Sequence, residues 1–347
     1  MMIYANVYAE GRNNNSIFEI DDSVHKYNPS HTPRLMRKLF LNQGIEINTP
    51  DINQGRPVSF DIHLEGSQLP QRQRPQYLIA MENPNINKLN CSIEYSSSFN
   101  LVFTWNKRLH HLPNIVPVMI PHPMHYGEFT TSSSRKIFSC LINANKYFKE
   151  EYPNDLYRER LKVIRWYEKY APHHFELYGL GWDKPPPAYT LAKRIRRGMQ
   201  RLRSKIDGKH PFPSYRGEIR EKSEILQQSR FSYCFENNSE IPNYITEKIF
   251  DSLVNGCIPI YWGASNIEDY IPIQCFIDRR NFKNTAEVHA HLLTINNDSY
   301  SIYQDNIRNF LASSDAVRFS SNHVLSTIIE HICIDFKKQL NIIAPTT

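Results

Sequence analysis

Short apolar runs alternate with polar turns and amphipathic stretches along the whole chain. In the first part, a helix is predicted at 32–42, and apolar runs predict strands at 1–8, 77–81, 99–105 and 116–121. In the second part, a strand at 136–142 is followed by a helix at 154–170 and a strand at 175–178. Strand-then-helix alternation in both parts predicts an α/β protein with two Rossmann-like domains facing a central cleft, divided as 1–130 and 131–347.

The segment 231–263 carries the clearest pattern in the chain. It predicts a buried strand at 231–235, a polar turn, a helix that opens near Tyr244, a break at Gly256 and a second apolar strand at 258–262. Ligands of open α/β sheets bind where strands end and helices begin, because amide N–H groups and the helix dipole favour anions there. Residues 237–247 occupy this place and are therefore the expected ligand site.

Two charged residues lie side by side in the first turn of this predicted helix. Glu247 can accept hydrogen bonds from two ribose hydroxyls, and Lys248 can pair with a diphosphate. This combination is typical of a site for a nucleotide-diphosphate sugar. An alternative interpretation is that Glu247 only complements the helix dipole and that Lys248 is a solvated surface residue.

Composition is that of a globular protein, with 347 residues of which 40% are hydrophobic. No apolar run approaches the roughly 18 residues that a membrane-spanning helix needs. The N-terminus carries no basic region or small-residue cleavage site, and the six cysteines are scattered singly. We expect a cytoplasmic protein with reduced thiols; a trimmed form of a membrane-anchored enzyme is the alternative.

Most of the excess positive charge lies in one segment. The net charge is +6, and residues 193–209 contain eight basic residues against a single acid. This segment belongs to a predicted insertion at about 184–213, in which apolar residues recur at helical spacing. The pattern predicts a basic amphipathic helix that either contacts an anionic membrane surface or packs on its own domain. No nucleic-acid partner is expected, because no aromatic residues interleave the arginines.

The string FENN(x)5YITEKIFDSL(x)4IPIYWG, within 235–263, resembles the signature of glycosyltransferase family 10, the α-1,3/4-fucosyltransferases, in its bacterial form. The resemblance implies a GT-B fold and transfer of L-fucose from GDP-fucose to a glycan hydroxyl with inversion. It also implies contacts to the donor from Asn237 and Tyr244, a contact of Glu247 with ribose or fucose hydroxyls, and a contact of Lys248 with a phosphate. Asn238 is an alternative to Asn237, and Glu236 is expected to brace the turn.

The family's catalytic base lies after an apolar strand, in a segment that 77–84 resembles. The resemblance implies that Glu82, the only acid between Glu65 and Glu94, is this base; without it, a surface glutamate after a strand is the simpler interpretation. A family arginine that binds the diphosphate corresponds to Arg160, with Arg158 and Arg165 as competitors. Arginine suits this role because its planar guanidinium binds phosphate oxygens in a bidentate manner.

The sequence contains no Asp-x-Asp triplet and no Cys/His cluster with zinc spacing. We therefore expect no required cofactor and no metal ligands, with Mn²⁺ or Mg²⁺ at most stimulating. The expected partners are GDP-fucose and an oligosaccharide or lipid-linked acceptor, in surface polysaccharide or lipopolysaccharide synthesis. The expected location is the cytoplasm, with peripheral attachment to the inner face of the cytoplasmic membrane through 193–209. Alternatives are a GT-B enzyme that uses another nucleotide sugar and a non-catalytic nucleotide- or anion-binding module.

Overall fold

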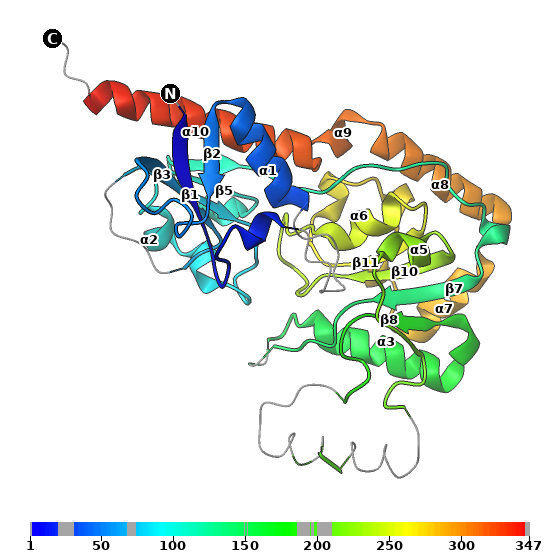
Figure 1. Cartoon of the computed structure of the whole chain (residues 1–347). Coiled ribbons are helices and arrows are strands. Elements are labelled where there is room, and N and C mark those ends of the chain that lie inside the picture. The colour runs from blue at the N-terminus through cyan, green and yellow to red at the C-terminus, as the bar shows by residue number, and fades with distance from the viewer. Residues whose placement is uncertain are drawn as a thin grey trace.

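The computed structural model describes residues 2–19, 31–67, 74–148, 150, 152–185, 195, 198–199 and 210–343. Within these residues the chain forms two parallel sheets of six strands each (Figure 1). The first has the order β2-β1-β3-β4-β5-β6, and the second has the order β12-β11-β10-β7-β8-β9. The predicted α/β architecture with two Rossmann-like domains is confirmed.

The first sheet is formed by β1 (Ile3–Ala9), β2 (Ile45–Asn48), β3 (Val58–Leu64), β4 (Gln76–Ala80), β5 (Leu101–Thr104) and β6 (Ile115–Pro117). The second is formed by β7 (Ile137–Ile142), β8 (Glu176–Tyr178), β9 (Tyr215–Gly217), β10 (Ser229–Phe235), β11 (Ile258–Trp262) and β12 (Ile277–Asp278). Central strands such as β4 and β10 are buried on both faces, as parallel sheets covered by helices require.

The α-helices are α1 (His31–Asn42), α2 (Ile93–Ser96), α3 (Leu156–Tyr170), α5 (Lys222–Leu226), α6 (Glu247–Leu253), α7 (Thr285–Thr294), α8 (Asn297–Leu311), α9 (Ser314–Val317) and α10 (Ser321–Ile343). Helix α3 illustrates how the sequence specifies them. Its N-cap Asp155 accepts a hydrogen bond from the amide of Tyr157, and its buried residues recur at three- and four-residue intervals.

Most predicted elements of the second part are confirmed, but the helix start near Tyr244 is wrong. Helix α6 begins at Glu247, and Thr246 before it has an extended backbone. Tyr244 instead lies in the loop, buried against Trp105 of the first domain at 5.0 Å between ring centroids. The sequence gives no signal of this loop, because the apolar side chains of Tyr244 and Ile245 are buried as helix residues would be.

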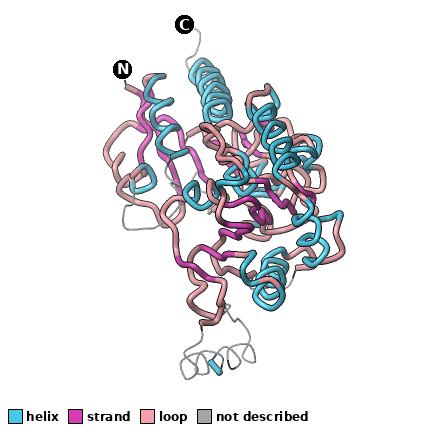
Figure 2. The backbone as a smooth tube through the Cα atoms, turned by 90° about the vertical axis from the view of Figure 1, so that its right-hand side faces the viewer, coloured by secondary structure: helices cyan, strands magenta, loops and turns pink. Residues whose placement is uncertain are grey.

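The last helix returns to the first domain. Residues Val324, Ile328 and Ile332 of α10 pack in the core formed by β1, β3 and β4, and in Figure 1 α10 runs beside β1 and β2. The chain crosses between the domains twice, near His122 and near Phe319. The two crossings lie together, because the amide of His122 donates to the carbonyl of Phe319 at 2.8 Å. Because α10 returns to the domain that begins with β1, both termini lie on the same side of the molecule (Figure 2). The division into 1–130 and 131–347 remains a prediction as a domain assignment.

The basic helix predicted at 193–209 lies almost entirely outside the described residues. Among the helices of the described part of the chain, none has the length and hydropathy needed to cross a membrane.

Candidate active site

A cavity of about 330 Å³ lies between the two domains, at the carboxyl ends of β4, β7 and β10. The first domain contributes Glu65, Met81 and Glu82, and the second domain contributes the opposite wall. All six residues predicted for the site line this cavity: Glu82, Arg160, Asn237, Tyr244, Glu247 and Lys248. The fold therefore brings together residues that are up to 166 positions apart in the chain (248 − 82 = 166).

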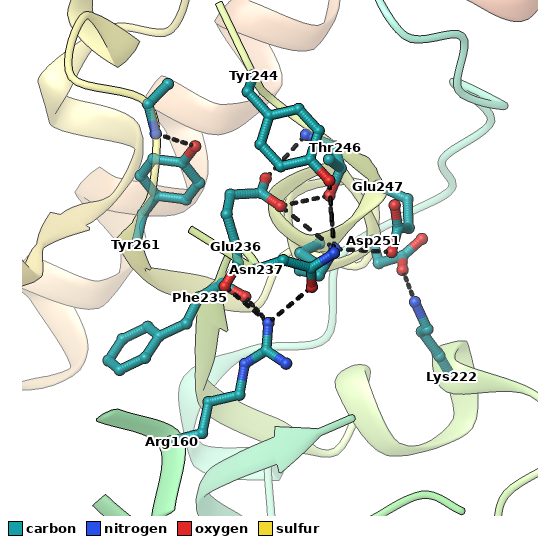
Figure 3. A network of polar contacts seen from close by, with 12 residues as sticks. Arg160, Lys222, Phe235, Glu236, Asn237, Tyr244, Thr246, Glu247, Asp251 and Tyr261 are labelled. Carbon is teal, nitrogen blue, oxygen red and sulfur yellow. Dashed lines mark hydrogen bonds and ion pairs between the residues drawn. The ribbon is translucent and has the colours of Figure 1, made fainter. Parts of the chain in front are cut away.

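The core of the site is a charged network at the start of α6 (Figure 3). The carboxylate of Glu236 is fully buried at the end of β10 and accepts hydrogen bonds from the amide of Thr246 at 2.8 Å and its hydroxyl at 2.7 Å. The ammonium group of Lys248 lies 3.2 Å from carboxylate oxygens of both Glu236 and Glu247. Glu236 thus ties the loop before α6 to the strand and fixes the position of the lysine.

Electrostatics keep the Glu247–Lys248 pair charged. Burial opposes the charge on Lys248, but the carboxylates of Glu247 and Glu236 outweigh it and raise the pKa of the lysine. Burial would raise the pKa of Glu247, but the ammonium groups of Lys248 and Lys222 hold it below its ordinary value. Both groups are therefore charged at neutral pH.

Arg160 reaches the same network from α3. Its Nη2 donates to the carbonyl oxygens of Phe235 at 2.6 Å and Glu236 at 2.8 Å, and its guanidinium lies 4.6 Å from the ring centroid of Tyr157. The side chain is buried, and its Nε has no hydrogen-bond partner among the described residues. Arg160 therefore binds the end of β10 and keeps one buried donor without a partner among the described residues. Its competitors point elsewhere, since Arg158 pairs with Asp155 and Arg165 with Glu168.

Asn237 and Tyr244 occupy the polar turn. The Oδ1 atom of Asn237 lies 3.4 Å from Nη2 of Arg160, and its Nδ2 lies 3.5 Å from the Tyr244 hydroxyl. Asn238 does not line the cavity, and its side chain faces the carbonyl oxygen of Asn154. Of the two neighbouring asparagines, the geometry favours Asn237 for contact with a ligand.

Glu82 faces this network from the first domain, two residues after β4. One of its carboxylate oxygens, Oε2, is buried without a hydrogen-bond partner among the described residues. Burial raises the pKa of Glu82, and the opposing attraction of Lys248 does not offset it. A partly desolvated carboxylate with a raised pKa and an unpaired oxygen has the properties of a general base.

Four further ionisable residues of the cavity were not anticipated from the sequence: Glu65, Lys146, Tyr157 and Lys222. Lys222, at the start of α5, forms an ion pair with Asp251, and Lys146 follows β7. The position of Lys146 after an apolar strand was a usable signal, because ligand sites gather at such ends. Nothing local marks Glu65, since β3 was not predicted. Among the described residues, no group of three or more His, Cys, Asp or Glu side chains is arranged to hold a metal ion.

Comparison with known proteins fits this geometry. Residues 203–338 match the model of glycosyltransferase family 10 (fucosyltransferase), C-terminal part. This part of the chain belongs to glycosyltransferase family 10. The match contains the whole segment from Glu236 to Lys248, so the charged network at the start of α6 lies inside the family's domain.

Two family relatives align with short parts of the chain. An α-(1,3)-fucosyltransferase of Helicobacter pylori is 40% identical over 70 residues, which are 20% of this chain and 14% of the relative. An α-(1,4)-fucosyltransferase of Arabidopsis thaliana is 38% identical over 80 residues, which are 22% of this chain and 20% of the relative. The matched stretches thus span a fifth or less of either relative's length.

The arrangement of the two domains is the GT-B fold. An α-glucosyltransferase solved with UDP-glucose and DNA containing an abasic site superposes with a TM-score of 0.57 at 12% identity, over 96% of this chain and 99% of the other. This likeness concerns the fold alone. The predicted GT-B architecture is confirmed.

Proposed function

We propose that the protein is an inverting fucosyltransferase that moves L-fucose from GDP-fucose to a glycan hydroxyl, in α-1,3 or α-1,4 linkage. One observation carries the proposal: a carboxylate oxygen of Glu82 that has no partner among the described residues and the Glu247–Lys248 pair line opposite walls of one cavity. The family match of the second domain supports the donor class.

The proposed reaction is a single displacement. The acceptor oxygen attacks the anomeric carbon of fucose while Glu82 takes the proton of the acceptor hydroxyl. The bond between the anomeric carbon and the β-phosphate oxygen breaks, and GDP leaves. Attack from the face opposite the diphosphate inverts the anomeric configuration.

Basic side chains would stabilise the charge that develops on the diphosphate. Lys248 and Arg160 line the second-domain wall together with Lys146 and Lys222. Cations placed where charge develops lower the barrier, because they need no reorganisation during the reaction. We therefore propose that no metal is required and that Mn²⁺ or Mg²⁺ at most stimulates. Glu247 would accept hydrogen bonds from donor hydroxyls.

The acceptor and the cellular setting are proposed from the sequence. We propose an oligosaccharide or lipid-linked acceptor in surface polysaccharide or lipopolysaccharide synthesis. The protein would work in the cytoplasm, attached peripherally to the inner face of the membrane through the basic segment 193–209. Charge reversal at Arg196, Arg197 and Arg201 should then abolish binding to anionic vesicles and leave transfer in solution intact; persistent binding would contradict the attachment.

The test begins with a thermal-shift screen of nucleotide sugars, since a ligand that binds only the folded state raises the unfolding temperature. GDP-fucose and GDP should stabilise the protein, and transfer from GDP-fucose to a glycan array should follow. Stabilisation by UDP-sugars alone would point to a GT-B enzyme with another donor.

The second part of the test is Glu82→Gln, which keeps the shape of the side chain and removes the base. Turnover should fall by about 10²- to 10⁴-fold while GDP binding survives. Unchanged turnover would remove Glu82 from the role of base, and Glu94→Gln is the matched control because Glu94 is exposed in the same domain.

A further inference from the structure

The segment that carries Glu82 is held by side chains and not by the sheet. Strand β4 ends before Met81, so the backbone groups of Met81 and Glu82 need other partners. The carboxylate of Glu65 accepts hydrogen bonds from the amide of Met81 at 3.2 Å and the amide of Glu82 at 3.1 Å. The indole of Trp105 donates to the Met81 carbonyl at 2.7 Å. The Nδ2 atom of Asn90 donates to the Glu82 carbonyl at 3.0 Å.

Glu65 is itself held firmly in place. It follows β3 with a left-handed backbone (φ 69°), a conformation that a residue with a side chain keeps only when its surroundings enforce it. Its amide donates to the carbonyl of Ile79 at 3.0 Å, and Asn90 Nδ2 donates to its carboxylate. The next residue, Gly66, donates to Asn90 Oδ1 at 2.7 Å, and a Cβ there would lie 2.5 Å from Cβ of Leu89.

We propose that Glu65 is a positioning residue for the transfer reaction: it binds both amides of the Met81–Glu82 segment and thereby directs the Glu82 carboxylate into the cavity. The inference rests on the proposed function and adds a residue that the family signature does not contain. Glu65 also lines the cavity, so its carboxylate is close enough to affect Glu82 through charge as well as geometry.

The two carboxylates influence each other. Burial raises the pKa of Glu65, and the nearby charge of Glu82 raises it further, against the hydrogen bonds from the Glu82 amide and Asn90. By reciprocity, a charge at Glu65 disfavours ionisation of Glu82. Lys248, Glu247 and Lys146 also act on Glu82 through their charge. The charge of Glu82 in turn acts on Tyr244 and Tyr157. Removal of the charge at Glu65 should therefore lower the pKa of Glu82.

The experiment uses Glu65→Gln in the full-length protein. An amide at this position presents NH₂ or a single neutral oxygen to three donors, so the segment shifts. The expected result is a fall in kcat of about 10- to 100-fold, as small misplacements of reacting groups produce, with KM for GDP-fucose and Kd for GDP unchanged. The acidic limb of the pH profile should move to lower pH, and hydrogen exchange should quicken at the amides of Met81 and Glu82.

Glu94→Gln is the matched control, because Glu94 is exposed in α2 of the same domain, and it should behave as wild type. Wild-type kcat and pH profile in Glu65→Gln would overturn the positioning role. So would a parallel loss of GDP affinity and of the unfolding temperature, since that pattern marks a structural residue. Absence of fucose transfer in the wild-type protein would instead overturn the proposed function, and with it the role of Glu65 in that reaction.

Discussion

At the scale of single residues, the site is defined by which polar groups the fold leaves without partners. Glu236 has its hydrogen bonds supplied by Thr246 and Lys248, which makes it a structural residue although it is adjacent to the site. Glu82, in contrast, keeps a buried oxygen without a partner among the described residues. Such a group is costly to bury, and this cost is typical of residues retained for chemistry.

The raised pKa of Glu82 leads to a pH prediction. A general base works only when ionised, so activity should fall as pH drops through the pKa of Glu82. Because burial raises this pKa, the fall should begin at higher pH than for an ordinary glutamate, whose pKa is about 4.3. The pH dependence of kcat measures it; constant activity down to pH 4 would contradict the assignment.

Arg160 gives a stability prediction. In Arg160→Lys, the ammonium group cannot reproduce the contacts to two carbonyl oxygens at the end of β10, and a buried charge is left poorly paired. The free energy of unfolding should fall by about 3 kcal/mol, as measured by urea denaturation. Arg158→Lys is the control on the same helix; its partly exposed ion pair with Asp155 should change stability by less than about 1 kcal/mol.

At the scale of elements, the turn between α6 and β11 depends on Gly256. Its backbone is left-handed (φ 61°), and an added Cβ would lie 2.4 Å from the ring of Phe129, which belongs to the segment joining the domains. The glycine therefore permits both the turn and the close approach of this segment to α6.

Three substitutions separate the effect of the left-handed backbone from the effect of the clash with Phe129. Gly44 has a left-handed backbone (φ 75°) with open space around an added Cβ. Gly44→Ala should therefore lower the free energy of unfolding by about 1 kcal/mol. Gly256→Ala adds the clash with Phe129 and should cost about 2–4 kcal/mol of unfolding free energy. Gly127→Ala, with no left-handed backbone and no atoms within 4 Å, should be nearly neutral. Equal losses of unfolding free energy in Gly44→Ala and Gly256→Ala would show that the ring of Phe129 moves aside.

At the scale of the whole molecule, α10 makes the first domain depend on the last part of the chain. Its Ile328 and Ile332 are fully buried in the core beneath β1 and β3. The first domain therefore cannot complete its core from residues 1–130 alone. The site lies between domains that are joined by two adjacent crossings, near His122 and Phe319.

Truncation of Ile328 tests this dependence. Ile328→Ala should lower stability by about 2–5 kcal/mol through cavity formation. Hydrogen exchange should quicken in β1, β3 and β4 of the first domain more than in β10 and β11 of the second, because the lost contacts belong to the first core. Ile334→Ala, on the exposed face of the same helix, should leave both domains unchanged. Uniform quickening in both domains would contradict the assignment of α10 to the first core.

The sequence by itself determined the α/β alternation and the motif at 235–263, because both are local. Strands such as 231–235 and 258–262 are continuous apolar runs, and the signature from Glu236 to Lys248 spans few residues. The start of the helix was wrongly predicted near Tyr244, because the burial of Tyr244 against Trp105 is a contact between residues 139 positions apart (244 − 105 = 139).

Only the tertiary structure decided which groups meet in the cavity. The approach of Glu82 to Lys248, the support of Glu82 by Glu65 and the return of α10 all depend on how separate elements pack. Neither the spacing of residues along the chain nor the period of apolar positions specifies such contacts, because they depend on how separate elements of the two domains pack around one cavity. Glu65 is the clearest case: its role follows from two backbone amides 16 and 17 residues away that the end of a strand leaves unpaired.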